Sequence, residues 1–523
     1  MKKLLILLGL ALASPALTSC ESFLDKNTDP NSPTETTPNF LLPSIISNGL
    51  AIQYGSEQRV AFFTQNVAAR GAGAGGADQY FLTNANSSAT FNNTYFLVGG
   101  NIPPMIKLAQ DEGSPYYVGA GKIMMALILS HATDMLGDIP YREAFQGEKN
   151  FTPAYDPQEQ LYGDIQQLLD EGIVEMSKPA SDNKRPFYIT TPAISGDILY
   201  RGDVQKWIRL AWSLKARQAN HLTKKGAKYE PKKVLEYASK GFLTSADDCI
   251  LQFVPTVNSG TPTTNYFSAG AGRLNFSTST FGANFIKFLN GATYPGVVDP
   301  RLPVMATATS PGADPGVGGG PQPTTTPTDF YRSFYTRELG YMDVITYHEL
   351  QFIKAEAAFL DGQKSVALAA YREGIRAHMA KIGVGGTTTP LSPDVPAAIP
   401  TITTAQINTY LASSAVAQTE ADLSTSAAPN VPRAIMQQKY IAMFLNPESW
   451  TDMRRYDFSP VIYPNLVFPV GANSDAGGKF PRRLLPATTE VQYNSANLRA
   501  QVGPDGINGL NSKFFTQKVW WDQ

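Results

Sequence analysis

The chain has 523 residues, of which 43% are hydrophobic and 17% charged, and its formal net charge is −1. The hydrophobic content is ample for a large core. The near-neutral charge, with no basic run, excludes a protein that binds nucleic acid or anionic lipid through a positive field. Only two cysteines are present, so the fold must depend on core packing rather than on a disulfide framework.

The first 20 residues are typical of a bacterial lipoprotein leader. Two lysines precede an apolar run over 4–12, and Leu17-Thr18-Ser19-Cys20 places small residues directly before a cysteine. This order indicates a secretory signal, and the apolar run is too short to span a bilayer. The sequence therefore predicts a signal peptide over 1–19 and a lipid-acylated Cys20, of the kind that carries palmitate. A plain signal peptide with a chance cysteine is the alternative.

The segment after the cysteine differs in composition from the rest of the chain. Residues 20–40 are polar and rich in proline, which predicts a tether that lifts a domain off a membrane. Helical patterns recur from residue 41 onward, and we expect 41–523 to form a single helical domain.

Apolar residues recur at helical spacing in separated blocks. Asp203 is the expected N-cap of one of these helices. The blocks lie over 41–70, 115–136, 157–169, a segment that begins at Gly202-Asp203, and 433–445.

The clearest supersecondary unit lies over 347–379. Two amphipathic helices are joined there by a turn at Asp361-Gly362-Gln363, with small residues where they meet. A helical pair of about 34 residues matches one tetratricopeptide-type repeat, and 115–174 supplies a looser copy. The predicted fold class is therefore mainly α: a tetratricopeptide-like α-solenoid scaffold with long irregular loop excursions that carry little β structure.

Long segments rich in glycine, serine, threonine, asparagine and proline separate the helices. Loops of this length are uncommon in compact domains unless they have a use, so we expect function to lie in them. These expected insertions are 71–104, 252–282, 306–329 and 383–430.

No catalytic or metal-binding motif stands out. The glycines of 71–76 satisfy GxGxxG but lack the strand before and the helix after that a dinucleotide site needs. The four histidines are dispersed, so a zinc site is not expected, and Cys249 is expected to be a small buried residue. We expect no cofactor, no metal and no enzymatic activity, although the sequence does not exclude a pair of catalytic carboxylates.

Several blocks, taken together, resemble the SusD/RagB family of nutrient-binding outer-membrane lipoproteins of Bacteroidetes, and more closely its SusD-like branch. They follow the family order along nearly the whole mature chain. The blocks are Cys20-Glu21-Ser22-Phe23-Leu24-Asp25, Thr133-Asp134-Met135-Leu136-Gly137-Asp138-Ile139-Pro140-Tyr141, Gly202-Asp203-Val204-Gln205-Lys206-Trp207, Asp299-Pro300-Arg301-Leu302-Pro303, Phe352-Ile353-Lys354-Ala355-Glu356-Ala357 and Pro481-Arg482-Arg483-Leu484-Leu485.

The resemblance implies a location, a ligand and a partner. It implies lipid anchoring at the cell outer membrane with display on the exterior, although the acidic cluster that often follows the cysteine in exported members is reduced to Glu21 and Asp25. It also implies capture of an oligosaccharide, or in some branches an oligopeptide, and delivery to a SusC-like TonB-dependent transporter. The alternatives are a scaffold lipoprotein that binds no ligand and, less favoured, a lipid-anchored hydrolase.

Aromatic residues in the loop-rich segments are the candidate ligand contacts. Rings stack on the apolar faces of sugars, while amide and guanidinium groups hydrogen-bond the hydroxyls. The alternative is that the rings are buried and pack the loops against the scaffold. We expect Trp207, Trp212 and Trp450 to be core residues, and Trp520 and Trp521 to dock the C-terminus on the body. The candidate ligand-binding residues are Tyr80, Phe81, Tyr266, Phe267, Arg273 and Asn275.

Overall fold

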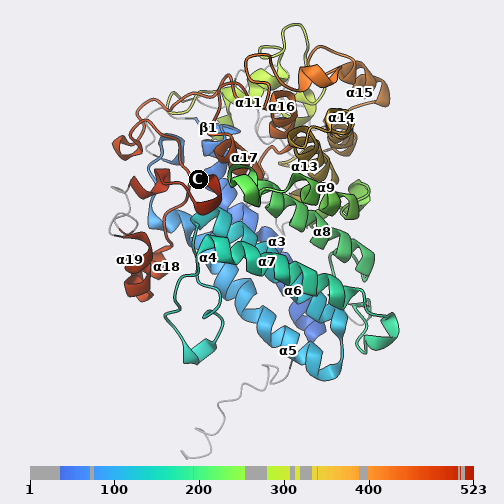
Figure 1. Cartoon of the computed structure of the whole chain (residues 1–523), viewed down its shortest axis with the longest axis vertical. Coiled ribbons are helices and arrows are strands. Elements are labelled where there is room, and N and C mark those ends of the chain that lie inside the picture. The colour runs from blue at the N-terminus through green and yellow to red at the C-terminus, as the bar shows by residue number, and fades with distance from the viewer. Residues whose placement is uncertain are drawn as a thin grey trace, which may run out of the picture.

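Helices dominate the computed structural model of the chain (Figure 1). It describes residues 36–70, 76–191, 194–253, 279–306, 312–318, 333–337, 340–387, 398–503, 507 and 513–523. The helices are α3 (Pro38–Phe63), α4 (Ser88–Asn92), α5 (Ile102–Glu112), α6 (Pro115–Leu136), α7 (Gln158–Met176), α8 (Val204–Asn220), α9 (Pro231–Lys240), α11 (Ala283–Leu289), α12 (Leu302–Met305), α13 (Tyr347–Leu360), α14 (Lys364–Ile382), α15 (Thr404–Leu411), α16 (Arg433–Ala442), α17 (Glu448–Arg455), α18 (Thr488–Tyr493) and α19 (Ser495–Val502).

Consecutive helices pack against one another and form a solenoid. The contacts run from α5 to α6, α7, α8 and α9, and continue through α13 to α14 and α16. Figure 1 shows this series rising from the lower part of the molecule to the upper right. The predicted tetratricopeptide-like scaffold is thereby confirmed.

Small residues allow the closest of these contacts. Gly119 of α6 lies against Gly172 of α7, where an added Cβ on Gly119 would come 3.0 Å from the carbonyl oxygen of Gly172. Gly374 of α14 likewise faces the ring of Phe352 on α13, and a Cβ added to Gly374 would lie 3.0 Å from the ring carbons. Larger side chains at these places would separate the helix pairs.

Several sequence predictions of helices are confirmed. Helix α6 has the predicted bounds, and the pair α13 and α14 turns at Gly362, whose φ is +79°. Helix α8 begins after Asp203, whose side chain accepts hydrogen bonds from the backbone N–H groups of Gln205 and Lys206. A carboxylate there satisfies N–H groups that have no partner within the helix.

Two predicted helices end earlier than expected. Helix α3 ends at Phe63, because Gln65 takes a left-handed φ of 55° and the residues after it form a strand. Helix α16 ends at Ala442, and a separate helix that the sequence did not indicate, α17, follows it. Helix α3 also begins at Pro38, within the residues assigned to the tether.

The strands within the described residues form four two-stranded antiparallel sheets, which agrees with the expectation of little β structure. Two of them matter below: β1 with β5, and β4 with β6. The pairs are β1 (Val67–Ala69) with β5 (Ser279–Phe281), β2 (Tyr188–Ile189) with β3 (Ser195–Gly196), β4 (Cys249–Gln252) with β6 (Tyr341–Ile345), and β7 (Val384–Thr387) with β8 (Ala398–Thr401).

Two of the expected loop-rich insertions contain short regular elements. Residues 77–101 form a series of short helical turns, one of which is α4, and 384–423 contains β7, β8 and α15. The polar residues that suggested loops act as caps: the Thr403 side chain and Gln406 form a capping box at the start of α15. Most of 252–282 and 306–329 lies outside the described residues.

The C-terminal residues dock on the helices, as predicted. Trp521 is fully buried, and its indole N–H donates to Asp134 Oδ1 at 2.9 Å. Trp207, Trp450 and Cys249 are also fully buried, whereas Trp212 is only half-buried. Trp207, Trp450 and Trp521 therefore serve the core, whereas Trp212, which the sequence placed in the core, keeps part of its surface exposed.

Candidate ligand-binding face

Segments from distant parts of the sequence meet around the upper half of the molecule. Strand β1 pairs with β5, the N–H of Phe253 donates to the carbonyl of Gly340 at 3.0 Å, and the N–H of Phe334 donates to Val304 at 3.0 Å. These contacts bring segments far apart in the sequence together beside the solenoid. We call this region the loop face; it contains β1, β5, Val304, Phe334 and the pair Phe253 and Gly340.

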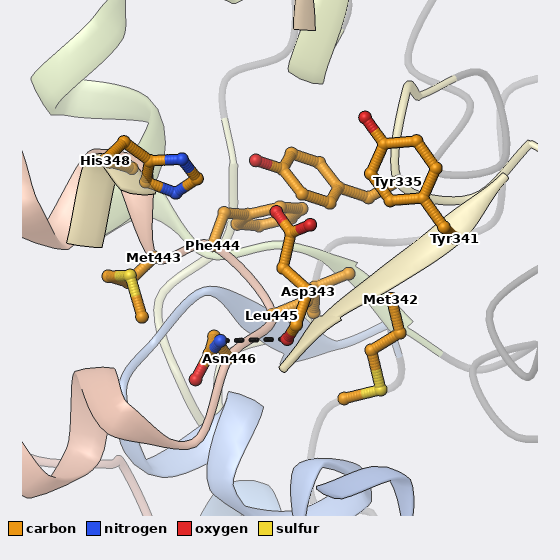
Figure 2. Close-up of a pocket in the computed structure, with 10 residues that line it drawn as sticks. Tyr335, Tyr341, Met342, Asp343, His348, Met443, Phe444, Leu445 and Asn446 are labelled. Carbon is orange, nitrogen blue, oxygen red and sulfur yellow. Dashed lines mark hydrogen bonds between the residues drawn. The ribbon is translucent and has the colours of Figure 1, made fainter. Parts of the chain in front are cut away.

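A pocket in the loop face is lined by aromatic, methionine and polar side chains (Figure 2). The pocket is shallow: its enclosed space is about 10 Å³, room for about one water molecule, and the value reaches about 330 Å³ only when the open solvent above it is counted. We name it the aromatic pocket, and its lining residues are Tyr335, Tyr341, Met342, Asp343, His348, Ala442, Met443, Phe444, Leu445 and Asn446.

The backbone around the turn after α16 shapes one wall of this pocket. Leu445 takes a left-handed φ of 54°, which ends the helical path before α17. The side-chain amide of Asn446 then donates to the carbonyl of Asp343 at 3.1 Å, the bond drawn in Figure 2. Its Oδ1 accepts from the N–H of Glu448 at 3.0 Å. One asparagine thus fixes the turn to β6 and supports the start of α17.

A buried lysine holds two acidic residues at the edge of the pocket. Lys381 Nζ lies 2.6 Å from a carboxylate oxygen of Asp248 and 2.6 Å from one of Asp343, and 5.1 Å from the centre of the Tyr341 ring. Burial raises the pKa of Asp248 to about 6. Burial alone would lower the pKa of Lys381, but the two carboxylates outweigh it and raise that pKa. The group fixes the position of Tyr341 without exposing a free charge.

An arginine lies over two rings beside the pocket. The guanidinium carbon of Arg337 is 3.6 Å from the ring centre of Phe334 and 5.1 Å from that of Tyr341. Such stacking keeps both ring planes and the guanidinium in a fixed arrangement. Tyr341 is half-buried, so part of its surface remains available to a ligand.

Two histidines lie beneath the pocket as neutral core residues. The rings of His348 and His378 are 5.0 Å apart, and the hydroxyl of Tyr335 is 2.8 Å from His378 Nε2. Burial lowers the pKa of both histidines well below the usual range. The hydrogen bond between His378 and the Tyr335 hydroxyl positions Tyr335. Among the described residues, no serine, cysteine or threonine lines the pocket.

The structure describes two of the predicted site residues, Tyr80 and Phe81, and they differ in exposure. Tyr80 has no exposed surface, and its ring packs edge-on against Phe63 at 5.9 Å and Phe468 at 5.7 Å. Burial raises the pKa of its hydroxyl well above the ordinary value. In this structure the Tyr80 ring therefore packs the loop against the body and offers no surface for a ligand to stack on. Burying a tyrosine on a scaffold of rings stabilises the loop instead.

Phe81, the second of these residues, is 37% exposed. Its loop is tied to a neighbouring one, because the side-chain amide of Gln79 donates to the carbonyl of Val470 at 2.8 Å. Val470 and Phe468 are exposed on that neighbouring loop. Phe81 therefore remains a candidate contact at the rim of the loop face. The other predicted contacts, Tyr266, Phe267, Arg273 and Asn275, lie outside the described residues, as does Cys20.

Sequence reasoning missed the rings of the aromatic pocket. It searched for aromatic residues in 71–104 and 252–282, whereas Tyr335 and Tyr341 lie between the third insertion and α13. The signal that could have found them is the run Ser333-Phe334-Tyr335-Thr336-Arg337, in which rings and a cation alternate with hydroxyl residues in a loop.

Elsewhere, a buried group brings together Asp134, His221 and Glu448, the one set of three possible metal ligands within 4.8 Å among the described residues. His221 Nδ1 is 3.3 Å from Asp134, and its Nε2 is 2.9 Å from Glu448. The carboxylates engage opposite nitrogens of one ring, which a single ion could not bridge. Burial alone would lower the pKa of His221, but the carboxylates raise it to about 9. The group is therefore a protonated histidine between two carboxylates.

The fold agrees with the comparisons to known proteins. A family model described as SusD-like, "starch-binding associating with outer membrane", matches residues 30–485. No match was found among curated proteins. No helix within the part of the chain described here has the length and apolar character that crossing a membrane requires.

Solved structures of similar fold cover nearly the whole chain. A SusD/RagB family protein from Bacteroides thetaiotaomicron has a TM-score of 0.71 and 21% identity, over 93% of this chain and 99% of its own. A chitin-binding protein has a TM-score of 0.65 and 22% identity, over 91% and 100%. A chitin-binding SusD homolog from Flavobacterium johnsoniae has a TM-score of 0.64 and 18% identity, over 92% and 98%. The family model matches most of the chain, and the chain therefore belongs to the SusD-like family, whose members associate with the outer membrane.

Proposed function

We propose that this protein is a lipid-anchored outer-membrane protein that captures a nutrient oligomer on its loop face and delivers it to a SusC-like TonB-dependent transporter. The binding involves no bond-making, so the protein is not an enzyme. The observation that carries the proposal is the aromatic pocket: in a member of a family described as starch-binding, half-buried Tyr341 lies within an array of rings and charged groups.

An oligosaccharide is the favoured ligand, with an oligopeptide as the alternative. Stacking needs partly exposed ring surface, and Tyr341 is half-buried, with Arg337 and Lys381 each 5.1 Å from its ring centre. Hydroxyl recognition needs polar groups nearby, and Asp343 and Asn446 lie in the same pocket. Pockets that combine an apolar wall with a few placed polar groups are typical of small-molecule recognition. Two proteins of similar fold are named as chitin-binding, which supports glycans as the first class to test.

The anchor and partner complete the proposal. Cys20 is the proposed lipidation site, 1–19 the signal peptide, and the residues up to the start of α3 at Pro38 the tether. Residues 38–523 would act as one body on this tether, facing the exterior, and the loop face would receive the ligand before transfer to the transporter.

Purification from the native membrane in mild detergent tests the location and the partner together. We expect a TonB-dependent barrel to co-purify and the N-terminal peptide to carry acyl chains on Cys20, both read by mass spectrometry. Calorimetry of the purified protein against chito-oligosaccharides, malto-oligosaccharides and oligopeptides then tests the ligand class. Absence of a barrel together with no binding across the panel would contradict the proposal, and new reducing ends after incubation would indicate a hydrolase.

A further inference from the structure

Two large apolar side chains are exposed where the helical body begins. Phe40 lies in the first turn of α3 and is 65% exposed, and Ile194, directly before β3, is also 65% exposed. Residues two apart on a helix point in directions about 200° apart, so Phe40 faces away from the fully buried Leu42. We call Phe40 and Ile194 the N-terminal patch.

A polar network joins the two segments that carry the patch. The side-chain amide of Asn39, which precedes Phe40, donates to Ser195 Oγ at 3.1 Å, and its Oδ1 accepts from Arg185 Nη1 at 3.2 Å. Arg185 in turn donates to the Glu112 carboxylate at the end of α5, through Nε at 2.7 Å and Nη2 at 2.5 Å. Helix α3 also packs against β3. The patch therefore lies on a base that several segments fix in place.

Helix α3 separates the patch from the loop face. It runs for 26 residues from Pro38 to Phe63, about 39 Å at 1.5 Å per residue, and β1 of the loop face follows it. Figure 1 shows α3 running from the lower part of the molecule toward β1, with α16 in the upper half. The patch therefore lies at the opposite end of α3 from the segments proposed to receive the ligand.

The proposed anchor joins the body next to the patch. Pro38, at the start of α3, is eighteen residues after Cys20, the proposed lipidation site. A chain of that length spans at most about 65 Å even when fully extended. Of the exposed large apolar residues in the described chain, Phe40 is the nearest to Cys20 in sequence. An acyl chain on Cys20 would thus keep the patch close to a bilayer.

The charges beside the patch balance one another. Arg185 is paired with Glu112, and Lys184 and Asp182, which are both exposed, carry opposite charges. A surface of this kind gains little from attraction to anionic headgroups and loses little from repulsion by them. The apolar side chains therefore decide its affinity for lipid.

We propose that the N-terminal patch rests on the lipid surface that anchors the chain, with Phe40 and Ile194 in the interfacial layer of the bilayer. Apolar side chains gain free energy when they leave water for the boundary between headgroups and acyl chains. Two side chains alone bind weakly, so the inference rests on the proposed lipid anchor, which keeps them near the surface. In this orientation α3 directs the loop face away from the bilayer.

Tryptophan fluorescence on vesicles tests the proposal. The chain from Cys20 to Gln523 is coupled through the Cys20 thiol to phosphatidylcholine vesicles that contain a maleimide lipid and brominated acyl chains. Cys249 is fully buried and does not compete for the maleimide. In Phe40→Trp and in Ile194→Trp, the emission added to that of the native tryptophans should shift to shorter wavelength and be lost to bromine quenching, because an indole in the interfacial layer lies close to the acyl chains.

Val470→Trp is the matched control. Val470 is 62% exposed, nearly as much as Phe40, and lies on the loop that Gln65 and Gln79 bond next to β1. Its added emission should be quenched by acrylamide in the water and not by bromine. Equal acrylamide quenching of the Phe40→Trp and Val470→Trp variants, without bromine quenching, would overturn the proposal. Bromine quenching of both would also overturn it, since the body would then lie flat on the lipid.

The coupling separates this test from that of the proposed function. The maleimide lipid supplies the anchor whether or not the cell acylates Cys20. A native chain without acyl groups on Cys20 would contradict the proposed anchor, whereas unquenched emission from coupled Phe40→Trp would contradict the contact between the patch and lipid.

Discussion

The buried ionic network of the solenoid and the aromatic pocket of the loop face use similar side chains in different ways. In the network, Arg455 and Glu356 form a bidentate pair with no exposed surface, and His221 is held between two carboxylates. In the pocket, Lys381 is also held between two carboxylates, but the ring next to it, Tyr341, is half-buried. Buried charge serves folding alone in the first region and presents a ring surface in the second.

The difference follows from what covers each region. The C-terminal residues close the network: Asp522 pairs with Arg482 and Lys224, and Trp521 fills the space beside Tyr162. In the aromatic pocket, by contrast, Tyr341 keeps partly exposed surface. Substitutions in the network should therefore affect stability, and substitutions in the pocket should affect binding. The predictions below test this separation.

The largest effect is expected for Glu356→Ala. The change leaves Arg455 buried, where the Glu356 oxygens now accept from it at 2.6 and 2.9 Å. Breaking a fully buried pair by removing one partner costs about 3–5 kcal/mol, so the free energy of unfolding measured with urea should fall by that amount. Glu356→Ala with Arg455→Met should recover part of the loss, since it removes the buried arginine, which in the single variant keeps only Asp452, at 2.5 Å, as an acidic partner. A fall in unfolding free energy of less than about 1 kcal/mol in the single variant would contradict this prediction, because it would show that water solvates the arginine.

The His221 group should make stability depend on pH. Its pKa is raised from an ordinary 6.5 to about 9, so its contribution is fully present below pH 6.5 and is lost as the pH rises through about 9. The size is about 3 kcal/mol, from about 1.4 kcal/mol per pKa unit. Urea unfolding from pH 6 to 9.5 should show this decline in the native protein and a flatter profile in His221→Gln.

His131 is the matched control for that measurement. Burial lowers its pKa to about 4, and its Nε2 lies 3.0 Å from the hydroxyl of Ser56. A lowered histidine pKa destabilises the fold only as the pH falls below the ordinary value. His131→Gln should therefore lower stability by a constant amount between pH 7 and 9.5. If both variants kept the slope of the native protein, another group would be responsible.

A smaller effect on free energy, and one confined to binding, is expected for Tyr341→Ala. Loss of a stacking ring should weaken oligosaccharide binding about tenfold, or about 1.4 kcal/mol, with little change in unfolding, because the ring is only half-buried. Tyr493→Ala removes a ring that is 73% exposed on α18 and should change neither quantity. Calorimetry against the glycan found for the native protein measures the first effect. If both variants bound the glycan with equal affinity, Tyr341 would not be a ligand contact.

The scaffold was more predictable than the site for a physical reason. Helix α8 can be predicted from local signals, namely the cap at Asp203 and an apolar face. The turn at Gly362 can be predicted because its left-handed backbone favours glycine. The aromatic pocket depends on contacts such as Asn446 with the Asp343 carbonyl, across 103 residues, and no local pattern encodes such contacts. Tyr80 illustrates the limit: its polar, glycine-rich neighbourhood suggested exposure, but rings from 63 and 468 bury it.

The smallest effect is expected for an ion pair outside both regions. Lys107 and Asp111 lie one turn apart on α5, 2.6 Å from each other, with side chains 75% and 61% exposed. Their chemistry matches that of the buried pairs, but water screens both charges, so Asp111→Ala should change the free energy of unfolding by no more than about 0.5 kcal/mol. Urea unfolding at low salt and in 1 M NaCl checks this, because added salt should remove even that difference. A loss as large as that of Glu356→Ala would mean that burial does not distinguish the network, and the contrast between the two regions would then rest on binding alone.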